Sequence, residues 1–404
     1  MDSLAQNIEA VTSQKSGVKR LTLTDFRNYA FLRVNPDLSP VIITGENGSG
    51  KTNLLEAVSF LTPGRGMRSA RLADIKRFMP AVVSDGYVPQ AGWAVSAQIY
   101  KNGDEYEIGT AVEKSLRETE DETRSFDRRI VKIEGEKSSA QTDLGRYFSA
   151  IWLTPQMDRL FRGGAQPRRS FLDRLVYAFD NEHAKRCSDF EHTYKQWYQL
   201  LKSSGGNADK NWLTGLEENM AALGVAIAAA RREQIARLNR FIAQAPDDVF
   251  PDVELKLDGI IEKMLDDMPA VDVEDFYARK LADERRNVLY NDNVDGVNRS
   301  DFKVYFRRKR MPAELCSTGE QKSLLISIIL AQTKCQILYR GFAPVLLLDE
   351  VAAHLDDGKR EALLAKIREL DLQAWITATN PEPFAAFRNY AQFWEVKNNS
   401  ITIK

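Results

Sequence analysis

The chain has 404 residues, 43% of them hydrophobic and 28% charged, a composition typical of a globular protein with two or three domains. Its 56 basic and 57 acidic side chains give a formal net charge of -1, so any nucleic-acid binding must come from a local basic patch. The longest apolar run, 220–230, is shorter than the roughly 20 residues that a membrane-spanning helix needs. Residues 1–16 are polar and lack the apolar stretch of a secretory signal. We therefore expect a cytoplasmic protein with no membrane partner and a loose tail over residues 1–16.

The cysteine and histidine content argues against a metal or disulfide framework. Cys187, Cys316 and Cys335 are odd in number and show no CxxC spacing, and the three histidines form no ligand cluster near them. The sequence therefore predicts neither a structural zinc site nor disulfide bonds.

The N-terminal part of the chain predicts a strand, a glycine-rich loop and a helix. Apolar and polar residues alternate over Val18–Thr24, which predicts a half-buried strand, and the apolar run Val41–Thr44 predicts a more deeply buried one. The loop 45–52 follows directly and leads to leucine and valine residues at helical spacing. Further on, the charged stretch 101–143 contains short β-like pieces such as Arg129–Ile133, which predicts surface hairpins.

The middle of the chain differs in composition from its two ends. From about Pro167 to Ile261, aromatic and aliphatic residues recur at helical spacing, which predicts an inserted helical lobe. After Tyr305 the α/β pattern returns. The elements predicted there are a helix from Glu320 to about Tyr339, a strand Val345–Leu348, a helix from Asp357 to about Leu370 and a strand Ala374–Ala378.

Residues 45–52, GENGSGKT, fit the pattern GxxxxGK[ST] in full. In this pattern glycines allow backbone N–H groups to surround phosphate oxygens, Lys51 reaches the β/γ-phosphates, and Thr52 ligates Mg²⁺. The alternative is a chance glycine-rich turn, and the buried strand before the loop and the amphipathic helix after it argue against that. The predicted ATP-binding residues are Gly45, Glu46, Asn47, Gly48, Ser49, Gly50, Lys51, Thr52 and Asn53.

The apolar strand Val345–Leu348 ends in two acids, Asp349 and Glu350. Ligands of open α/β sheets bind at the carboxyl ends of the strands, so Asp349 is a candidate to hold Mg²⁺ across from Thr52. Glu350 is then a candidate to polarise an attacking water. The alternative is a solvated acidic turn, and the presence of the glycine-rich loop favours the functional interpretation.

A third motif, CSTGEQK at 316–322, precedes an amphipathic helix. Ser317 is a good N-cap, so ordinary helix initiation is the alternative. The order Ser-x-Gly-Glu, upstream of a strand that ends in Asp-Glu, nevertheless resembles the signature motif of ABC-type ATPases. Ala353–Asp356 resembles the D-loop of that class, and Leu153–Gln156 resembles its Q-loop.

The resemblance to ABC-type ATPases implies a site that two chains complete together. The glycine-rich loop of one subunit binds ATP, and Ser317 and Gly319 of a second subunit close on the γ-phosphate in trans. Residues implied to act in cis are Lys51, Thr52, Gln156, Asp349 and Glu350, with Gln156 joining Thr52 and Asp349 at the metal. Asp356 of the D-loop is implied to contact the nucleotide.

Several blocks narrow the resemblance to one family. LTLTDFRNYA near the start, LTPQMDRLFRGGAQPRRSFLD, GVNRSDF and LLLDEVAAHLD resemble the RecF family of bacterial recombination-mediator ATPases. This resemblance implies an α/β fold, an ABC-type P-loop ATPase head with a mixed sheet, an inserted mainly helical lobe and no long coiled coil. The implied segments are a tail (1–16), the N-terminal part of the ATPase lobe (17–165), the helical lobe (166–290) and the C-terminal part of the ATPase lobe (291–404).

The family resemblance also implies a function. ATP binding would close a homodimer on duplex DNA or on a gap junction and help RecR and RecO-like partners load RecA on single strands. Weak, DNA-stimulated ATP hydrolysis would then release the protein, which would be cytoplasmic and associated with the nucleoid. Arg27 and Asn28 match a basic-polar pair that lies near the nucleotide phosphates. A nucleotide-binding subunit of a membrane ABC transporter and a non-hydrolysing ATP-binding scaffold stay open as alternatives.

The chain departs from these patterns at several positions. Asn298 stands where RecF-like chains commonly have histidine, and no histidine follows the strand Ala374–Ala378 at the switch position of transporters. Thr379 and Asn380 are the candidates to replace it. Basic clusters that could contact DNA phosphates, or be ordinary solvated faces, are Arg65, Arg68, Arg71, Lys76 and Arg77, and Arg307, Arg308, Lys309 and Arg310.

Overall fold

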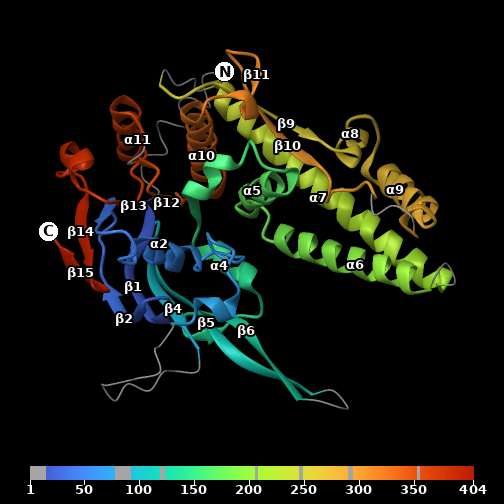
Figure 1. The fold of residues 1–404 in the computed structure, drawn as a ribbon, viewed down its shortest axis with the longest axis horizontal. Helices are drawn as coiled ribbons and strands as arrows, with labels where there is room; N and C mark the ends of the chain where they lie inside the picture. The colour runs from blue at the N-terminus through green and yellow to red at the C-terminus, as the bar shows by residue number, and fades with distance from the viewer. Residues whose placement is uncertain are drawn as a thin grey trace. The chain divides into compact units, whose positions relative to one another are not determined.

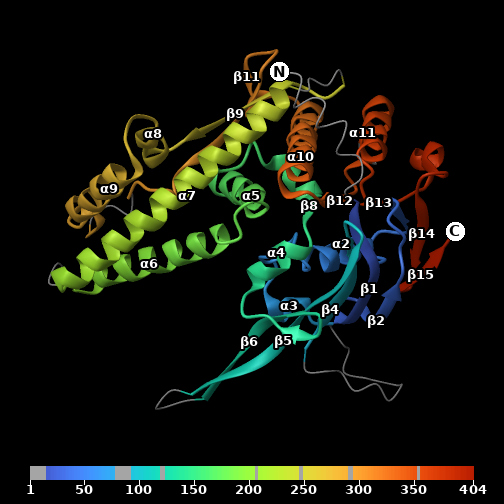
Figure 2. The same cartoon turned by 180° about the vertical axis from the view of Figure 1, so that it is seen from behind.

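The computed structural model describes residues 15–77, 92–118, 123–204, 208–244, 249–289, 294–352 and 355–404. The chain forms two compact units: unit 1 comprises residues 1–157 and 333–404, and unit 2 comprises residues 158–332. Figures 1 and 2 show the ribbon from two opposite sides. The predicted tail, 1–16, lies outside the described residues except for Lys15 and Ser16, and the first strand begins at Ser16.

Unit 1 contains an antiparallel sheet in the order β2-β1-β4-β5-β6-β7. Its strands are β1 (Ser16–Phe26), β2 (Tyr29–Val34), β4 (Ala94–Lys101), β5 (Asp104–Glu118), β6 (Thr123–Ile133) and β7 (Glu136–Lys137). The strand predicted over Val18–Thr24 is confirmed within β1. The hairpins predicted over 101–143 are confirmed by β5, β6 and β7, which pair in succession.

A second, mixed sheet in unit 1 has the order β15-β14-β3-β13-β12-β8. Its strands are β3 (Val41–Thr44), β8 (Ala150–Leu153), β12 (Val345–Asp349), β13 (Ala374–Ala378), β14 (Gln392–Lys397) and β15 (Ser400–Ile403). All of them run parallel except β15. The strands predicted from continuous apolar runs are confirmed, since β3, β12 and β13 are buried along their whole length. Parallel pairing brings the carboxyl ends of β3, β12 and β13 to one edge of the sheet.

Helix α2 (Lys51–Ser59) begins at this edge and lies between the two sheets of unit 1. It contacts β1 of the antiparallel sheet and both β12 and β13 of the mixed sheet. Leu54, Leu55, Ala57 and Val58 are fully buried, so the helix has an apolar contact on each side. The other helices of unit 1 are α3 (Leu72–Ile75), α4 (Leu144–Tyr147) and α11 (Asp357–Glu369).

Unit 2 is mainly helical and carries a small antiparallel sheet. Its helices are α5 (Ala165–Tyr177), α6 (His183–Ser204), α7 (Lys210–Gln244), α8 (Ile260–Asp267) and α9 (Ala270–Glu284). Helix α10 (Thr318–Arg340) begins in unit 2, and its last turns belong to unit 1. Helices α6 and α7 pack together over a core that includes Trp197 and Met220. Within the described parts of the chain, no helix is both long and apolar enough to cross a bilayer.

The mainly helical lobe predicted from about Pro167 to Ile261 also contains a strand that the helical spacing did not indicate. Strand β9 (Val253–Asp258) lies inside that segment and pairs with β10 (Asp301–Phe306), which also pairs with β11 (Met311–Pro312). Val253, Leu255 and Leu257 alternate with polar residues, which is the strand period. The average composition of the segment hid this short alternation.

The buried centre of unit 2 brings together His183, Cys187 and Asp173, a contact that the sequence did not indicate. His183 and Cys187 are one helical turn apart on α6, and Cys187 Sγ lies 3.6 Å from His183 Nε2. Asp173 on α5 accepts from His183 Nε2 at 2.8 Å and from Arg231 Nε and Nη2 at 2.7 and 2.9 Å. Because the guanidinium occupies both carboxylate oxygens and repels a cation, these groups form an ion-pair network rather than a metal site. Cys187, Cys316 and Cys335 are free thiols.

We expect the buried Asp173–Arg231 ion pair to stabilise unit 2 in a pH-dependent way. Burial alone would raise the pKa of Asp173, but the charges of Arg231 and His183 hold that pKa at about 2. A lowered carboxyl pKa contributes stability that is present above the unfolded value of about 3.9 and is lost as the pH falls toward 2. Asp173→Asn removes the bidentate carboxylate partner of the buried Arg231 guanidinium, which keeps the more distant Glu262 Oε1 at 3.9 Å and the Val297 carbonyl at 2.7 Å. The substitution should lower the unfolding free energy by about 3–5 kcal/mol.

Urea unfolding followed by tryptophan fluorescence at pH 7 measures this effect. Asp266→Asn removes the partner of Arg232 at an exposed pair and should change the unfolding free energy by less than about 1 kcal/mol. Equal effects of the two substitutions would contradict the assigned role of the buried pair.

Candidate functional site

The glycine-rich loop after β3 has the backbone conformation that only glycine adopts readily. Gly45, Gly48 and Gly50 have φ angles of 146°, 82° and 107°, in the left-handed region. A Cβ at Gly45 would collide with the Val396 carbonyl, and one at Gly50 would collide with the Asn28 amide. The two outer glycines are therefore required by both torsion and space, and the loop turns its backbone inward ahead of α2.

Lys51 is the first residue of α2 and points its ammonium group back over the loop. Its Nζ donates to the carbonyls of Gly45 at 2.6 Å and Glu46 at 2.9 Å. Burial lowers the pKa of Lys51, and the negative charges of Glu350 and Asp349 oppose this shift. The two acids predicted at the end of β12 thus lie close enough to act electrostatically on the lysine of the loop.

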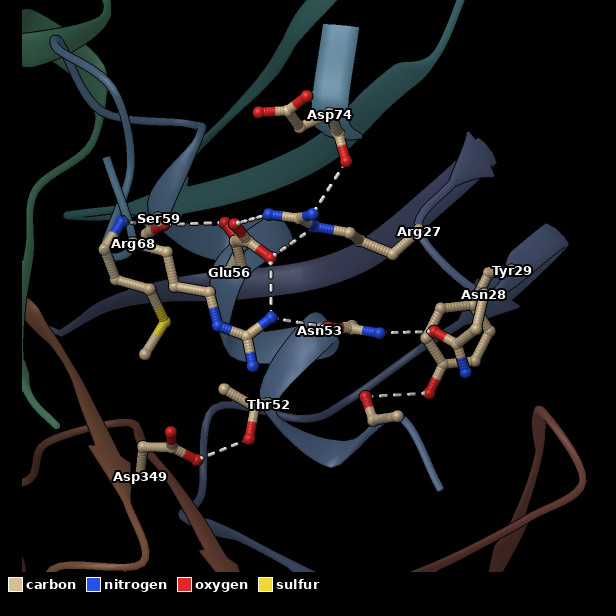
Figure 3. A network of polar contacts seen from close by, with 12 residues as sticks. Arg27, Asn28, Tyr29, Thr52, Asn53, Glu56, Ser59, Arg68, Asp74 and Asp349 are labelled. Atoms are coloured by element: carbon tan, nitrogen blue, oxygen red, sulfur yellow. Dashed lines mark hydrogen bonds and ion pairs between the residues drawn. The ribbon is translucent and has the colours of Figure 1, made fainter. Parts of the chain in front are cut away.

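Thr52 and Asp349 meet directly, as the sequence predicts. Thr52 Oγ1 donates to Asp349 Oδ1 at 2.8 Å (Figure 3). Asp349 is 6% exposed and also accepts from Thr377 Oγ1 at 2.9 Å. A hydroxyl and a carboxylate oxygen are the hard donors that Mg²⁺ prefers, so these two residues fit a magnesium ion, which would supply neutralisation of phosphate charge when bound.

The loop, the start of α2 and the acidic turn enclose a cleft of about 240 Å³. Its lining residues are Asn47, Gly48, Gly50, Lys51, Thr52, Asn53, Arg68 and Glu350. Two cations, Lys51 and Arg68, and one carboxylate, Glu350, are among these residues. Such a set can bind a phosphate chain and hold a water for attack on it.

Arg68 is a lining residue that sequence reasoning placed elsewhere, in a candidate DNA patch. Its Nη1 donates to Asn53 Oδ1 at 2.8 Å and to Glu56 Oε2 at 3.2 Å (Figure 3). Glu56 is fully buried in α2, so its carboxylate needs a cationic partner. This need becomes visible only when the fold brings Arg68 next to Glu56. No sequence motif indicated this residue.

Arg27, predicted near the phosphates, is the second partner of Glu56. Its Nε and Nη2 bind the carboxylate at 2.9 and 2.6 Å, and its Nη1 donates to the Asp74 carbonyl at 2.8 Å. Arg27 and Asp25 both have left-handed φ angles, 55° and 48°. The strained turn between β1 and β2 therefore delivers a guanidinium to Glu56 rather than to the cleft itself.

Asn28 connects the same turn to the loop. Its Oδ1 accepts from Asn53 Nδ2 at 2.7 Å, and its Nδ2 donates to the Ser49 carbonyl at 3.4 Å. The neighbouring Tyr29 donates its hydroxyl to the Gly50 carbonyl at 3.2 Å. Asn28 and Asn53 thus lie at the loop and support its backbone and α2 (Figure 3), and their contact with a nucleotide stays a prediction.

Gln156 and Asp356 are not brought into the cleft among the described residues. Gln156 is exposed on a short 3-10 segment, Pro155–Arg159, directly after β8, at the same sheet edge as Asp349. Asp356 caps α11 by accepting from the Lys359 backbone N–H at 2.9 Å. Ala353 and His354 of the predicted D-loop lie outside the described residues.

The predicted signature motif lies at the beginning of α10 in unit 2. Glu320 Oε2 accepts from the Ser317 backbone N–H at 2.8 Å, and Ser317 Oγ accepts from the Glu320 backbone N–H at 3.3 Å, which is a capping box. Hydrogen bonds from Lys309 and from the Ser317 backbone lower the pKa of Glu320 to about 2. Ser317, Thr318 and Gly319 are all exposed.

The two basic clusters divide into paired and exposed residues. In the turn between β10 and β11, residues 307–310 are all exposed; there Arg307 pairs with Asp252, and Lys309 pairs with Glu320. Arg65, Arg68, Arg71 and Lys76 are exposed, and Arg68 also lines the cleft. Contact of either cluster with DNA stays a prediction.

Comparison with known proteins identifies the family. Residues 17–402 match the RecF/RecN/SMC N terminal domain family. The chain is 43% identical over 387 residues to the DNA replication and repair protein RecF of Rhizobium rhizogenes, which covers 95% of this chain and 98% of that protein. It is 42% identical over 388 residues to RecF of Mesorhizobium japonicum, covering 95% and 97%. The chain belongs to the RecF family.

Solved structures support the same fold for this RecF-family chain. A structure of the recombination mediator protein RecF-ATPrS in the RecFOR pathway matches with a TM-score of 0.79 at 18% identity, covering 97% of this chain and 99% of that one. An Smc head bound to the C-winged helix domain of ScpA matches with a TM-score of 0.51 at 14% identity, covering 96% and 97%. The predicted ABC-type ATPase head with a mixed sheet and an additional helical part is confirmed.

Arg68 gives a test of the cleft in this RecF-family protein. Arg68→Ala removes a cation from the lining and one partner of Glu56, and we expect ATP affinity to fall by about tenfold to a hundredfold, the loss of one charge-assisted hydrogen bond. Calorimetric titration with a non-hydrolysable ATP analogue measures it. Arg65→Ala, an exposed change in the same segment outside the cleft lining, should leave this affinity unchanged, and equal losses in both variants would refute the assignment.

Proposed function

We propose that this protein is an ATP-dependent DNA-binding ATPase of replication and recombinational repair. The observation that carries the proposal is the contact of Thr52 with Asp349 at the cleft that Lys51 and Glu350 also line. In this proposal Lys51 and the loop N–H groups bind the phosphates, Thr52 and Asp349 hold Mg²⁺, and Glu350 polarises the attacking water. Family membership supports a role like that of the RecF relatives in DNA replication and repair.

ATP would be buried between two copies of the chain, with Ser317 and Gly319 acting in trans. The exposed beginning of a long helix supports this, since the positive end of the helix dipole attracts a phosphate. A Cβ at Gly319 would meet nothing within 4 Å in the described structure, so no contact within the chain requires glycine there. The close approach of a partner's nucleotide would require it.

The closed dimer would bind duplex or gapped DNA through phosphate contacts and act with RecR and RecO-like partners to help RecA load on single strands. The exposed basic turn 307–310, doubled in a dimer, supports backbone binding without base readout. Hydrolysis, weak and DNA-stimulated, would open the dimer and release the DNA. Gln156 and Asp356 would complete the site on closure, and the protein would work in the cytoplasm at the nucleoid.

Two alternatives were a subunit of a membrane ABC transporter and a scaffold that binds ATP without hydrolysing it. A transporter subunit is disfavoured because the matching family spans residues 17–402 and its curated relatives are RecF proteins. A non-hydrolysing scaffold is opposed by the presence of Glu350 at the cleft, and turnover decides between the two.

Glu350→Gln tests hydrolysis and closure together. Loss of the general base should lower kcat by about 10²–10⁴-fold while ATP still binds, so the variant should accumulate as a closed dimer. Light scattering with Mg²⁺-ATP should then show twice the 45.8 kDa chain mass, and a gapped duplex should remain bound at low salt and dissociate at high salt.

Two further variants control this experiment. Lys51→Met should stay monomeric with ATP, because the phosphates lose their cation. Glu361→Gln, an exposed change on α11, should behave as wild type. A mass and DNA retention that ignore ATP in every variant would contradict the in-trans site.

A further inference from the structure

Thr377 is a fully buried residue on β13 that no motif singled out. It is 0% exposed and lies opposite Asp349 in the parallel pairing of β12 with β13. Its hydroxyl makes two hydrogen bonds to consecutive residues of β12 and the turn after it. Oγ1 donates to Asp349 Oδ1 at 2.9 Å and accepts from the Glu350 backbone N–H at 2.9 Å.

The chemistry of a hydroxyl fixes the direction of these two bonds. Threonine has one O–H proton, and a carboxylate can only accept, so the proton must point to Asp349. The lone pair is then left for the Glu350 N–H. Because threonine is branched at Cβ, its χ1 angle has few allowed values, and burial holds the hydroxyl between its two partners.

The turn that this hydroxyl holds is strained. Glu350 has a φ of 55°, a left-handed conformation that a residue with a Cβ adopts only when its surroundings enforce it. The bond from its N–H to Thr377 is such a constraint. The Asp349 oxygen that Thr377 binds is also the one that Thr52 binds, so one hydroxyl orients the proposed metal ligand and the proposed base together.

We propose that Thr377 is a positioning residue for the Asp349–Glu350 turn, setting the metal ligand and the general base in register with Thr52. This inference rests on the proposed ATPase function. Thr379 and Asn380, the sequence candidates for the end of this strand, are both exposed, and neither makes a hydrogen bond to the cleft in the described part of the chain. The strand therefore acts on the acidic turn through a buried side chain two residues before Thr379 and three before Asn380.

The test compares Thr377→Val, which keeps the shape and removes the hydroxyl, with Thr377→Ser, which keeps the hydroxyl. Loss of a supporting residue behind a metal ligand typically lowers metal affinity or activity by about 10–100-fold. We expect Thr377→Val to lower kcat and the affinity for Mn²⁺, measured by electron paramagnetic resonance with a non-hydrolysable ATP analogue, by that factor. KM for ATP should change by less than about threefold, since the lysine and the loop are intact.

Thr377→Ser should restore both quantities to within about threefold of wild type. Thr402→Val, the same substitution at an exposed position of β15 in the same sheet, controls for loss of a strand hydroxyl. If the valine variant does not fold, Thr377→Ala and Thr377→Ser differ from each other only by the hydroxyl and carry the same comparison.

The outcomes separate this inference from the proposed function. Normal turnover and Mn²⁺ affinity in Thr377→Val, beside an active wild type, would overturn the positioning role and leave the ATPase proposal standing. An inactive wild type whose Mn²⁺ affinity still falls in Thr377→Val and recovers in Thr377→Ser would overturn the ATPase proposal and support the positioning role. A serine variant as impaired as the valine variant would also overturn the role, because the hydroxyl would then not be the acting group.

Discussion

The burial of Glu56 is the constraint on which much of unit 1 depends. Helix α2 must pack against both sheets to carry the glycine-rich loop, so a carboxylate in its middle has no access to water. An unpaired buried charge costs several kcal/mol, and two guanidiniums therefore converge on it. Arg27 comes from a strained turn and Arg68 from the segment after α2 (Figure 3). The strain at Asp25 and Arg27 is thereby offset by a bidentate ion pair.

The same pairing shapes the cleft. Arg68 donates to both Glu56 and Asn53, and Asn53 in turn donates to Asn28. The buried Glu56 carboxylate, the turn that carries Asn28 and the glycine-rich loop therefore belong to one polar network. Cooperative networks of this kind stabilise a single arrangement of their members. A nucleotide phosphate would therefore meet Arg68 and the loop already held in place, and would compete with the carbonyl contacts of Lys51 and with Glu56 for Arg68.

The sequence was sufficient to assign site residues where the residues of a motif are adjacent in the chain. The loop 45–52 and the acids at 349 and 350 could be assigned because each motif follows a continuous apolar strand, and parallel strands place such ends at one edge. Arg68, Glu56 and Thr377 could not, because their roles depend on partners between 12 and 29 residues away in the sequence. Likewise β9 was missed because its alternating pattern is short, and the Cys187–His183 contact because helical spacing alone does not show which face is buried.

A threonine at the end of β13 has a different consequence from a histidine there. A hydroxyl does not change its charge between pH 5 and 8, whereas an imidazole does, so Thr377 can hold the acidic turn in one geometry but cannot report the charge of a bound phosphate. That task would then belong to the cations at the cleft, Lys51 and Arg68. Arg68 and Arg27 both pair with Glu56. A phosphate that binds Arg68 would therefore compete with the Glu56 carboxylate. Binding of ATP would thus change the ion pairs of Glu56 on α2 and of Arg27 in its turn. These lie away from the strand end where transporters place the histidine.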